Sequence, residues 1–240
     1  MFKIALNAGH YYGTPGKRCL NTIDPAETRE WTLNSRICEK VERKLQGYDG
    51  YELLRIDDRT GRSDITVADR AAKANRFGAD IYVAVHHNAG INGGSGGGIM
   101  AFTYLRVDDY TKRMQRLLYD KLIEKTGLKG NRAQPLSTAD LGECRLTKMP
   151  AVLLECGFMD STVDTPVILT EDFADKAAAG ITEAIAELGA LTKRTESAPE
   201  TADKDGGLYY VQVGAYRSKS NAEEMVKRLK ELGFDAIIKR

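Results

Sequence analysis

The 240-residue sequence predicts an α/β protein with a mainly parallel, twisted sheet flanked by helices, followed by a small C-terminal strand-helix-strand unit. Two observations support this prediction. Apolar, β-branched runs alternate with segments of helical periodicity over most of the chain, which is typical of parallel strands joined by helices. With 42% hydrophobic residues, the chain can also bury one good core and leave room for a second, smaller unit.

The first helix is predicted to begin at residues 24–27, Asp-Pro-Ala-Glu, which has the order of an N-cap, a proline at the first helical position and a glutamate at the third. Its buried stripe is marked by Leu33, Ile37, Val41 and Leu45, which recur every four residues. Glu30 precedes Leu33 by three residues. It therefore belongs to this stripe and is expected to point inward.

The remaining elements of the α/β unit follow from apolar runs and from helical periodicity. Strands are predicted at residues 2–6, 51–56, 80–85, 98–105 and 151–158. Further helices are predicted at residues 66–78, 108–127 and 171–189, the last closed by Gly189.

A domain boundary is predicted at residues 192–206, which are rich in charge, Thr, Ser and Pro and have no apolar periodicity. The predicted domains are therefore residues 1–191, a linker at 192–206 and a C-terminal unit at 207–240. In that unit Met225, Leu229 and Leu232 share one helical face, and no second copy of the unit occurs in the chain.

The composition excludes several partners. Lys and Arg number 35 against 34 for Asp and Glu, so net charge gives no reason to expect nucleic-acid binding. No apolar run approaches the roughly 18 residues that span a bilayer, and the first ten residues do not have the pattern of a signal peptide. We expect synthesis in the cytoplasm, no membrane insertion, and four scattered cysteines kept as reduced thiols.

The three histidines of the chain all lie where an apolar strand ends. His10 follows the first strand, His86 and His87 follow the strand at 80–85, and Glu155 lies within the strand at 151–158. Carboxyl ends of strands in open α/β sheets form a crevice, so these side chains and Glu30 could converge. A zinc hydrolase needs three N or O ligands, a position for water, and a base that is not a ligand.

Each of these residues also has a purely structural interpretation. A histidine after a strand is often a hydrogen-bonded loop residue, and Glu155 could be a salt-bridged strand end. His86 and His87 point to opposite faces of a strand, so at most one of them is expected to reach a shared metal. Periodicity does not choose between these two histidines.

Four elements resemble, in order, motifs of the zinc-dependent N-acetylmuramoyl-L-alanine amidases, which cut peptidoglycan between the lactyl group of muramic acid and the first peptide residue. They are NAGH at 7–10, REWTLN at 29–34, AVHHNA at 84–89 and VLLECGF at 152–158. The segments LLRIDD at 53–58 and ADRAAKAN at 68–75 also resemble the family's pattern. The resemblance runs from about residue 2 to residue 190.

This resemblance implies a role for each matched residue. It implies one zinc ion per chain with His10, Glu30 and His86 as ligands and Glu155 as the catalytic base. It also selects His86 over His87, which is left as a pocket-lining or exposed residue without a role.

The remaining matched positions imply contacts with substrate, and some positions depart from the family's pattern. Asn88 and Arg70 are expected to bind substrate. The family's Asp-Pro before the first histidine is replaced by Asn7-Ala8, a change that bears on the support of the metal ligands.

The C-terminal unit resembles one repeat of a sporulation-related (SPOR) peptidoglycan-binding domain, chiefly through YYVQVGAY at 209–216 and LGFDAII at 232–238. The resemblance implies peptidoglycan as partner and an autolysin or endolysin that acts on the cell wall. A lone repeat leaves a sheet edge open, so pairing into a homodimer is possible. Two alternatives stay open: a non-catalytic wall-binding or amidase-regulating protein, and a zinc peptidase of the stem peptide.

Overall fold

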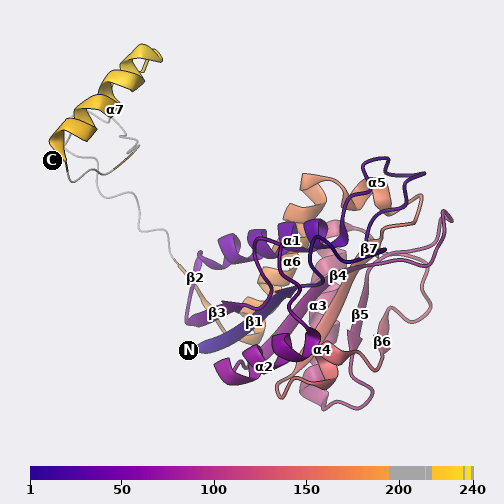
Figure 1. Cartoon of the computed structure of the whole chain (residues 1–240). Coiled ribbons are helices and arrows are strands. Elements are labelled where there is room, and N and C mark those ends of the chain that lie inside the picture. Colours follow the sequence, from indigo (N-terminus) through magenta and orange to yellow (C-terminus); the bar gives the residue numbers. More distant parts are fainter. Residues whose placement is uncertain (195–213, 215–217, 235, 239–240) are drawn as a thin grey trace. The chain divides into compact units, whose positions relative to one another are not determined.

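The computed structural model describes residues 1–194, 214, 218–234 and 236–238 (Figure 1). By its internal contacts the chain divides into two compact units, Met1–Arg194 and Thr195–Arg240.

The first unit is built on a six-stranded sheet with the order β3-β1-β4-β7-β5-β6. The strands are β1 (Phe2–Ala8), β3 (Tyr51–Arg55), β4 (Ile81–Asn88), β5 (Met100–Thr103), β6 (Leu136–Thr138) and β7 (Ala151–Phe158). β3, β1, β4 and β7 are mutually parallel, as are β5 and β6, whereas β5 is antiparallel to β7. The predicted α/β class with a mainly parallel sheet is confirmed.

The antiparallel pairing of β5 follows from the connection that precedes it. No helix lies between β4 and β5, and the connecting residues 89–99 contain a glycine-rich stretch. A chain that leaves the sheet at the carboxyl end of a strand and re-enters it there, without a crossover helix, runs antiparallel to the strand that it left. The apolar run at residues 98–105 predicts this strand but not its direction.

Helices cover both faces of the sheet (Figure 1). They are α1 (Glu30–Leu45), α2 (Val67–Phe77), α3 (Asp109–Thr126), α4 (Gly142–Arg145), α5 (Thr165–Ile168) and α6 (Glu171–Leu188). α1, α3 and α6 share one apolar core with the sheet, whereas α2 and α4 share a second core on the opposite face. Both faces of β1 are buried, since Ile4 and Leu6 belong to the first core and Ala5 to the second.

The predicted start of the first helix is wrong. α1 begins at Glu30, and residues 24–27 form a turn instead. The carboxylate of Asp24 accepts hydrogen bonds from the backbone N–H groups of Ala26 and Thr28. These hydrogen bonds stabilise a local turn and do not cap a helix. The buried stripe was predicted correctly, and Glu30 is 1% exposed.

The first unit extends slightly beyond its predicted end. A two-stranded ribbon of β2 (Tyr48–Asp49) and β8 (Thr192–Lys193) ties residues 192–193 to the α/β unit. Residues 192 and 193 of the predicted linker therefore belong to the first unit.

In the second unit the structure describes one helix, α7 (Lys219–Glu231), where a helix was predicted. Of the predicted flanking strands, the first falls almost entirely on residues outside the described set and the second only partly within it.

Candidate active site

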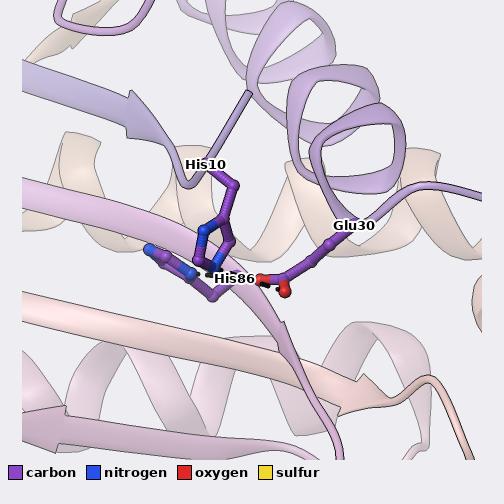
Figure 2. A group of neighbouring side chains, drawn as sticks. All are labelled: His10, Glu30 and His86. Atoms are coloured by element: carbon purple, nitrogen blue, oxygen red, sulfur yellow. Dashed lines mark hydrogen bonds and ion pairs between the residues drawn. The ribbon is translucent and has the colours of Figure 1, made fainter. Parts of the chain in front are cut away.

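Three side chains that the sequence analysis selected as metal ligands converge at the carboxyl edge of the sheet (Figure 2). His10 follows β1, His86 lies near the end of the neighbouring β4, and Glu30 is the first residue of α1. One ligand atom from each lies within 4.8 Å of the others. His10 Nε2 is 3.4 Å from Glu30 Oε2, and His86 Nδ1 is 3.1 Å from Glu30 Oε1.

The turn after β1 has no room for a side chain at Gly9. A Cβ atom at this position would lie 2.0 Å from Cε1 of His86, so the backbone can pass the imidazole only as glycine. His10 then takes a left-handed conformation with φ of 64°, which is uncommon for a residue other than glycine. Arg70 holds this turn, because its guanidinium donates to the carbonyl oxygen of His10.

Glu30 has one carboxylate oxygen bound and one free of hydrogen bonds. Oε1 contacts Nδ1 of His86 and accepts a hydrogen bond from the backbone N–H of His87. Oε2 is buried without a hydrogen-bond partner among the described residues, and it faces His10 and, at 3.6 Å, the ammonium of Lys17. A buried, unbonded carboxylate oxygen beside two imidazole nitrogens fits a cation, and the N,N,O donor set is one that zinc accepts.

The two candidate imidazole ligands differ in their protonation. Burial lowers the pKa of His10 to about 4, so its ring is neutral at pH 7 and can ligate a metal. Burial also opposes charge on His86, but Glu143 and Glu30 outweigh it and raise the pKa of His86 to about 10. In the protein without a bound cation, a proton therefore occupies Nδ1 of His86, and a metal must displace it.

Glu155 lies beside this cluster but does not belong to it. Its Cα pairs with that of His86 across β4 and β7, and the cluster of potential ligands does not include its carboxylate. Burial raises the pKa of Glu155 to about 7, and Oε2 is buried without a hydrogen-bond partner among the described residues. A pKa near the working pH suits a general base.

His87 is buried and hydrogen-bonded rather than exposed. Its side chain is buried, and Nδ1 lies 2.8 Å from Oδ1 of Asn34. Asn34 donates from its amide to the carbonyl oxygen of Gly9, so its Oδ1 acts as the acceptor and the His87 Nδ1–H as the donor. Burial lowers the pKa of His87 to about 3, so the ring is neutral. It braces Asn34 and the turn before His10.

The two side chains expected to bind substrate are placed differently. Asn88, at the end of β4, is partly exposed and its Oδ1 accepts from the backbone N–H of Ala89. Arg70 is 2% exposed, and its guanidinium donates to Asn7 Oδ1 and to the carbonyl oxygens of Ile65, Ala8 and His10. We therefore assign Arg70 to positioning the turn after β1 rather than to substrate contact.

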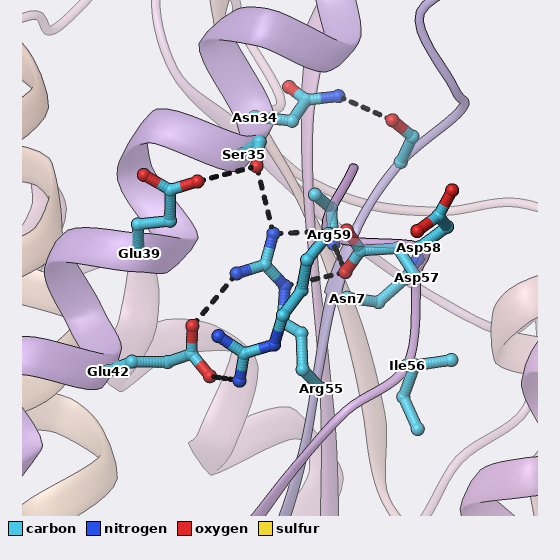
Figure 3. Close-up of polar contacts among 12 residues, drawn as sticks. Asn7, Asn34, Ser35, Glu39, Glu42, Arg55, Ile56, Asp57, Asp58 and Arg59 are labelled. Atoms are coloured by element: carbon cyan, nitrogen blue, oxygen red, sulfur yellow. Dashed lines mark hydrogen bonds and ion pairs between the residues drawn. The ribbon is translucent and has the colours of Figure 1, made fainter. Parts of the chain in front are cut away.

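A second network holds the other side of that turn (Figure 3). The buried guanidinium of Arg55 donates to both oxygens of Asp57 and to Ser35 on α1, and it pairs with Glu42. Asp57 in turn accepts from the backbone N–H of Ala8. The ends of β1 and β3 and the first turns of α1 are thus tied together around His10 and Glu30.

A third acid at the site, the buried Glu143, was not predicted from the sequence. It lies in the four-residue helix α4, is 6% exposed, and its Oε1 is 3.5 Å from Nε2 of His86. Burial raises the pKa of this carboxyl, but His86 and Arg70 outweigh burial and hold the pKa below its ordinary value. No periodicity surrounds residue 143, so nothing in the sequence separated it from the exposed glutamates.

An open, mainly parallel α/β sheet with two histidines and a glutamate gathered at its carboxyl edge, and an acid beside them, is an arrangement that metallohydrolases use. The chain belongs to the N-acetylmuramoyl-L-alanine amidase family, whose sequence model matches residues 4–187. A SPOR domain model matches residues 205–240. The chain is thus a peptidoglycan amidase with a C-terminal SPOR match.

Individual proteins agree with this assignment. The sporulation-specific N-acetylmuramoyl-L-alanine amidase of Bacillus subtilis (strain 168) is 29% identical over 238 residues, covering 99% of this chain and 84% of that one. The endolysin of Bacillus phage SPP1 is 35% identical over 137 residues, which cover 57% of this chain and 50% of the phage protein. The N-acetylmuramoyl-L-alanine amidase of Clostridium difficile 630 has the same fold, with a TM-score of 0.69 at 24% identity over 78% of this chain and 95% of that structure.

The described residues contain no helix long and apolar enough to cross a bilayer.

Proposed function

We propose that the protein hydrolyses the amide bond between N-acetylmuramic acid and L-alanine with one zinc ion held by His10, Glu30 and His86. The observation that carries this proposal is the convergence of those three side chains, with ligand atoms within 4.8 Å of one another and one buried carboxylate oxygen unpaired among the described residues. When bound, zinc lowers the pKa of its water from about 15.7 to about 7 and polarises the scissile carbonyl.

The residues of the chain supply the remaining chemistry. Glu155 takes the proton from the attacking water and passes it to the leaving amine of L-alanine, a role worth about 10² to 10⁴ in rate. Its partly buried carboxylate, with a pKa of about 7, is suited to both transfers. Asn88, partly exposed at the same strand end, is placed to contact substrate. Arg70 and Asn34 act indirectly, because both hold the backbone of the turn that carries His10.

Mass spectrometry of purified peptidoglycan fragments tests the reaction. We expect new amino groups on L-alanine and free lactyl carboxyl groups on muramic acid, and a Glu155→Gln variant with the same zinc content serves as the inactive control. New amino groups elsewhere in the stem peptide would instead identify a zinc peptidase. Binding to peptidoglycan without any cleavage would identify a non-catalytic wall protein.

For the C-terminal unit, we propose that it binds peptidoglycan and pairs with a second copy of itself. The SPOR match supports the binding. The described part of this unit exposes Leu232, Phe234, Ile237 and Ile238, which is much apolar surface for so short a segment. Pairing would cover such side chains and place two catalytic units on one wall. Static light scattering tests this: the full chain should be a dimer and the chain without residues 195–240 a monomer.

A further inference from the structure

The imidazole of His86 lies between two buried carboxylates. Its Nδ1 is 3.1 Å from Glu30 Oε1, and its Nε2 is 3.5 Å from Glu143 Oε1. Nδ1 is on the side of the ligand cluster, whereas Nε2 is buried and has no hydrogen-bond partner among the described residues. The distance of 3.5 Å between Nε2 and Glu143 Oε1 is within ion-pair range. If the two atoms moved about 0.5 Å closer together, they would form a good hydrogen bond.

The opposite oxygen of Glu143 is held by two donors. Oε2 accepts from the amide of Asn7 at 2.9 Å and from the hydroxyl of Tyr82 at 3.2 Å. Asn7 cannot reverse its amide freely, because its Oδ1 accepts from the guanidinium of Arg70 at 2.6 Å. β1, β4 and α2 thus fix the carboxylate with Oε2 toward these donors and Oε1 toward His86.

We infer that Glu143 is a positioning residue that accepts the Nε2–H of His86 and so leaves the lone pair of Nδ1 for the metal. This inference rests on the proposed zinc site. A ligating histidine commonly donates its other ring N–H to a carboxylate, and loss of that partner typically weakens metal affinity by about 10- to 100-fold. Here the partner comes from a short helix on the opposite side of the sheet from α1, which supplies Glu30.

The substitution Glu143→Gln is a sharp probe of this role. Asn7 and Tyr82 require an acceptor at the position of Oε2, so the glutamine must place its carbonyl oxygen there and turn its NH₂ group toward His86. Nε2 then faces a donor and favours the tautomer that carries the proton on Nδ1, which is the wrong tautomer for the metal. Tyr82→Phe is the matched control, because it removes one bond to Oε2 and leaves Oε1 in place.

The test measures zinc affinity of the full chain by competition with a chromophoric chelator, together with ¹⁵N-histidine NMR of the zinc-loaded protein. We expect Glu143→Gln to weaken affinity by about 10- to 100-fold and to lose the downfield Nε2–H signal of His86, with Tyr82→Phe changing neither by more than about threefold. The chain has three histidines, and a His87→Gln variant identifies the His87 signals without removing a proposed zinc ligand.

Equal zinc affinity and an unchanged Nε2–H signal in Glu143→Gln would overturn the positioning role. Equal losses in Glu143→Gln and Tyr82→Phe would also overturn it, since they would indicate general loosening of the site. If the unsubstituted protein bound no zinc, the proposed metal site itself would fail, and that result is distinct from both.

Discussion

Glu155→Gln should stabilise the protein in a pH-dependent manner while it abolishes catalysis. Burial raises the pKa of Glu155 from 4.5 to about 7, so between these values the folded state holds a proton that the unfolded state has lost. Stability therefore falls as pH rises from 4.5 to 7, and above pH 7 the penalty is complete. At 1.36 kcal/mol for each pH unit, the full penalty is about 3 kcal/mol in the protein without a bound metal.

A neutral glutamine carries no such penalty. Burying the glutamine amide has a free-energy cost that does not depend on pH. That cost cancels when the effect of the substitution on the free energy of unfolding is compared at two pH values. In the presence of a chelator we expect Glu155→Gln to gain about 2 to 3 kcal/mol more at pH 8 than at pH 5. For a unit of this size, each kcal/mol shifts the melting temperature by about 2 to 4 °C.

Urea unfolding of both proteins at pH 5 and pH 8 measures this difference. With zinc present, the same variant should keep its metal and lose amidase activity by about 10² or more, because an amide cannot accept the water proton. An equal change in stability at both pH values would refute the assigned pKa and its cause. Loss of zinc from the variant would make Glu155 a ligand and refute its role as the base.

Three further predictions concern the ligands, the turn and the C-terminal unit. His86→Ala should lose most of the bound zinc, whereas His87→Ala should keep it and only unfold more easily. Mass spectrometry of the native proteins measures the zinc content, and the reverse pattern would contradict the assignment of His86. Gly9→Ala should weaken zinc binding in a chelator titration without removing any ligand, because the added methyl group overlaps the His86 ring, and unchanged affinity would show that the turn adapts. Deleting residues 195–240, after the β2–β8 ribbon, should weaken cosedimentation with sacculi and leave hydrolysis of a soluble muramyl-peptide nearly unchanged, since tethering raises effective concentration only on an insoluble substrate; equal sedimentation of both proteins would contradict a binding role.

The sequence predicted the parts of the site that depend on topology. His10 and His86 could be placed together because carboxyl ends of neighbouring parallel strands meet at one edge, and the inward direction of Glu30 followed from the apolar stripe of its helix. The choice between His86 and His87 came from the family resemblance, because strand alternation alone left it open. In the structure both rings are buried, and a register shift between His86 and Asn88 disturbs simple alternation.

Other features depend on contacts that no local pattern records. Residues 24–27 are of the types found at the N-terminus of a helix, but the carboxylate of Asp24 accepts hydrogen bonds within a turn. Arg70 has the residue type expected of a substrate contact, yet backbone carbonyls and Asn7 surround its guanidinium. Glu143 reaches His86 from 57 residues further along the chain, through a helix too short to show periodicity.

The charges next to Glu30 explain how this buried carboxylate tolerates both the absence of a metal and a bound divalent cation. Without metal, Glu30 is balanced by the proton on His86 and by the ammonium of Lys17, which lies 3.6 Å from Oε2. Lys17 is 45% exposed, so it can withdraw into solvent at little cost. A divalent cation would displace the proton of His86 and the ammonium of Lys17, which together carry two positive charges. Because the cation itself carries two positive charges, the total charge next to Glu30 would stay the same. Glu30 is therefore not left as an unpaired buried carboxylate in either state, which is the arrangement that costs the most.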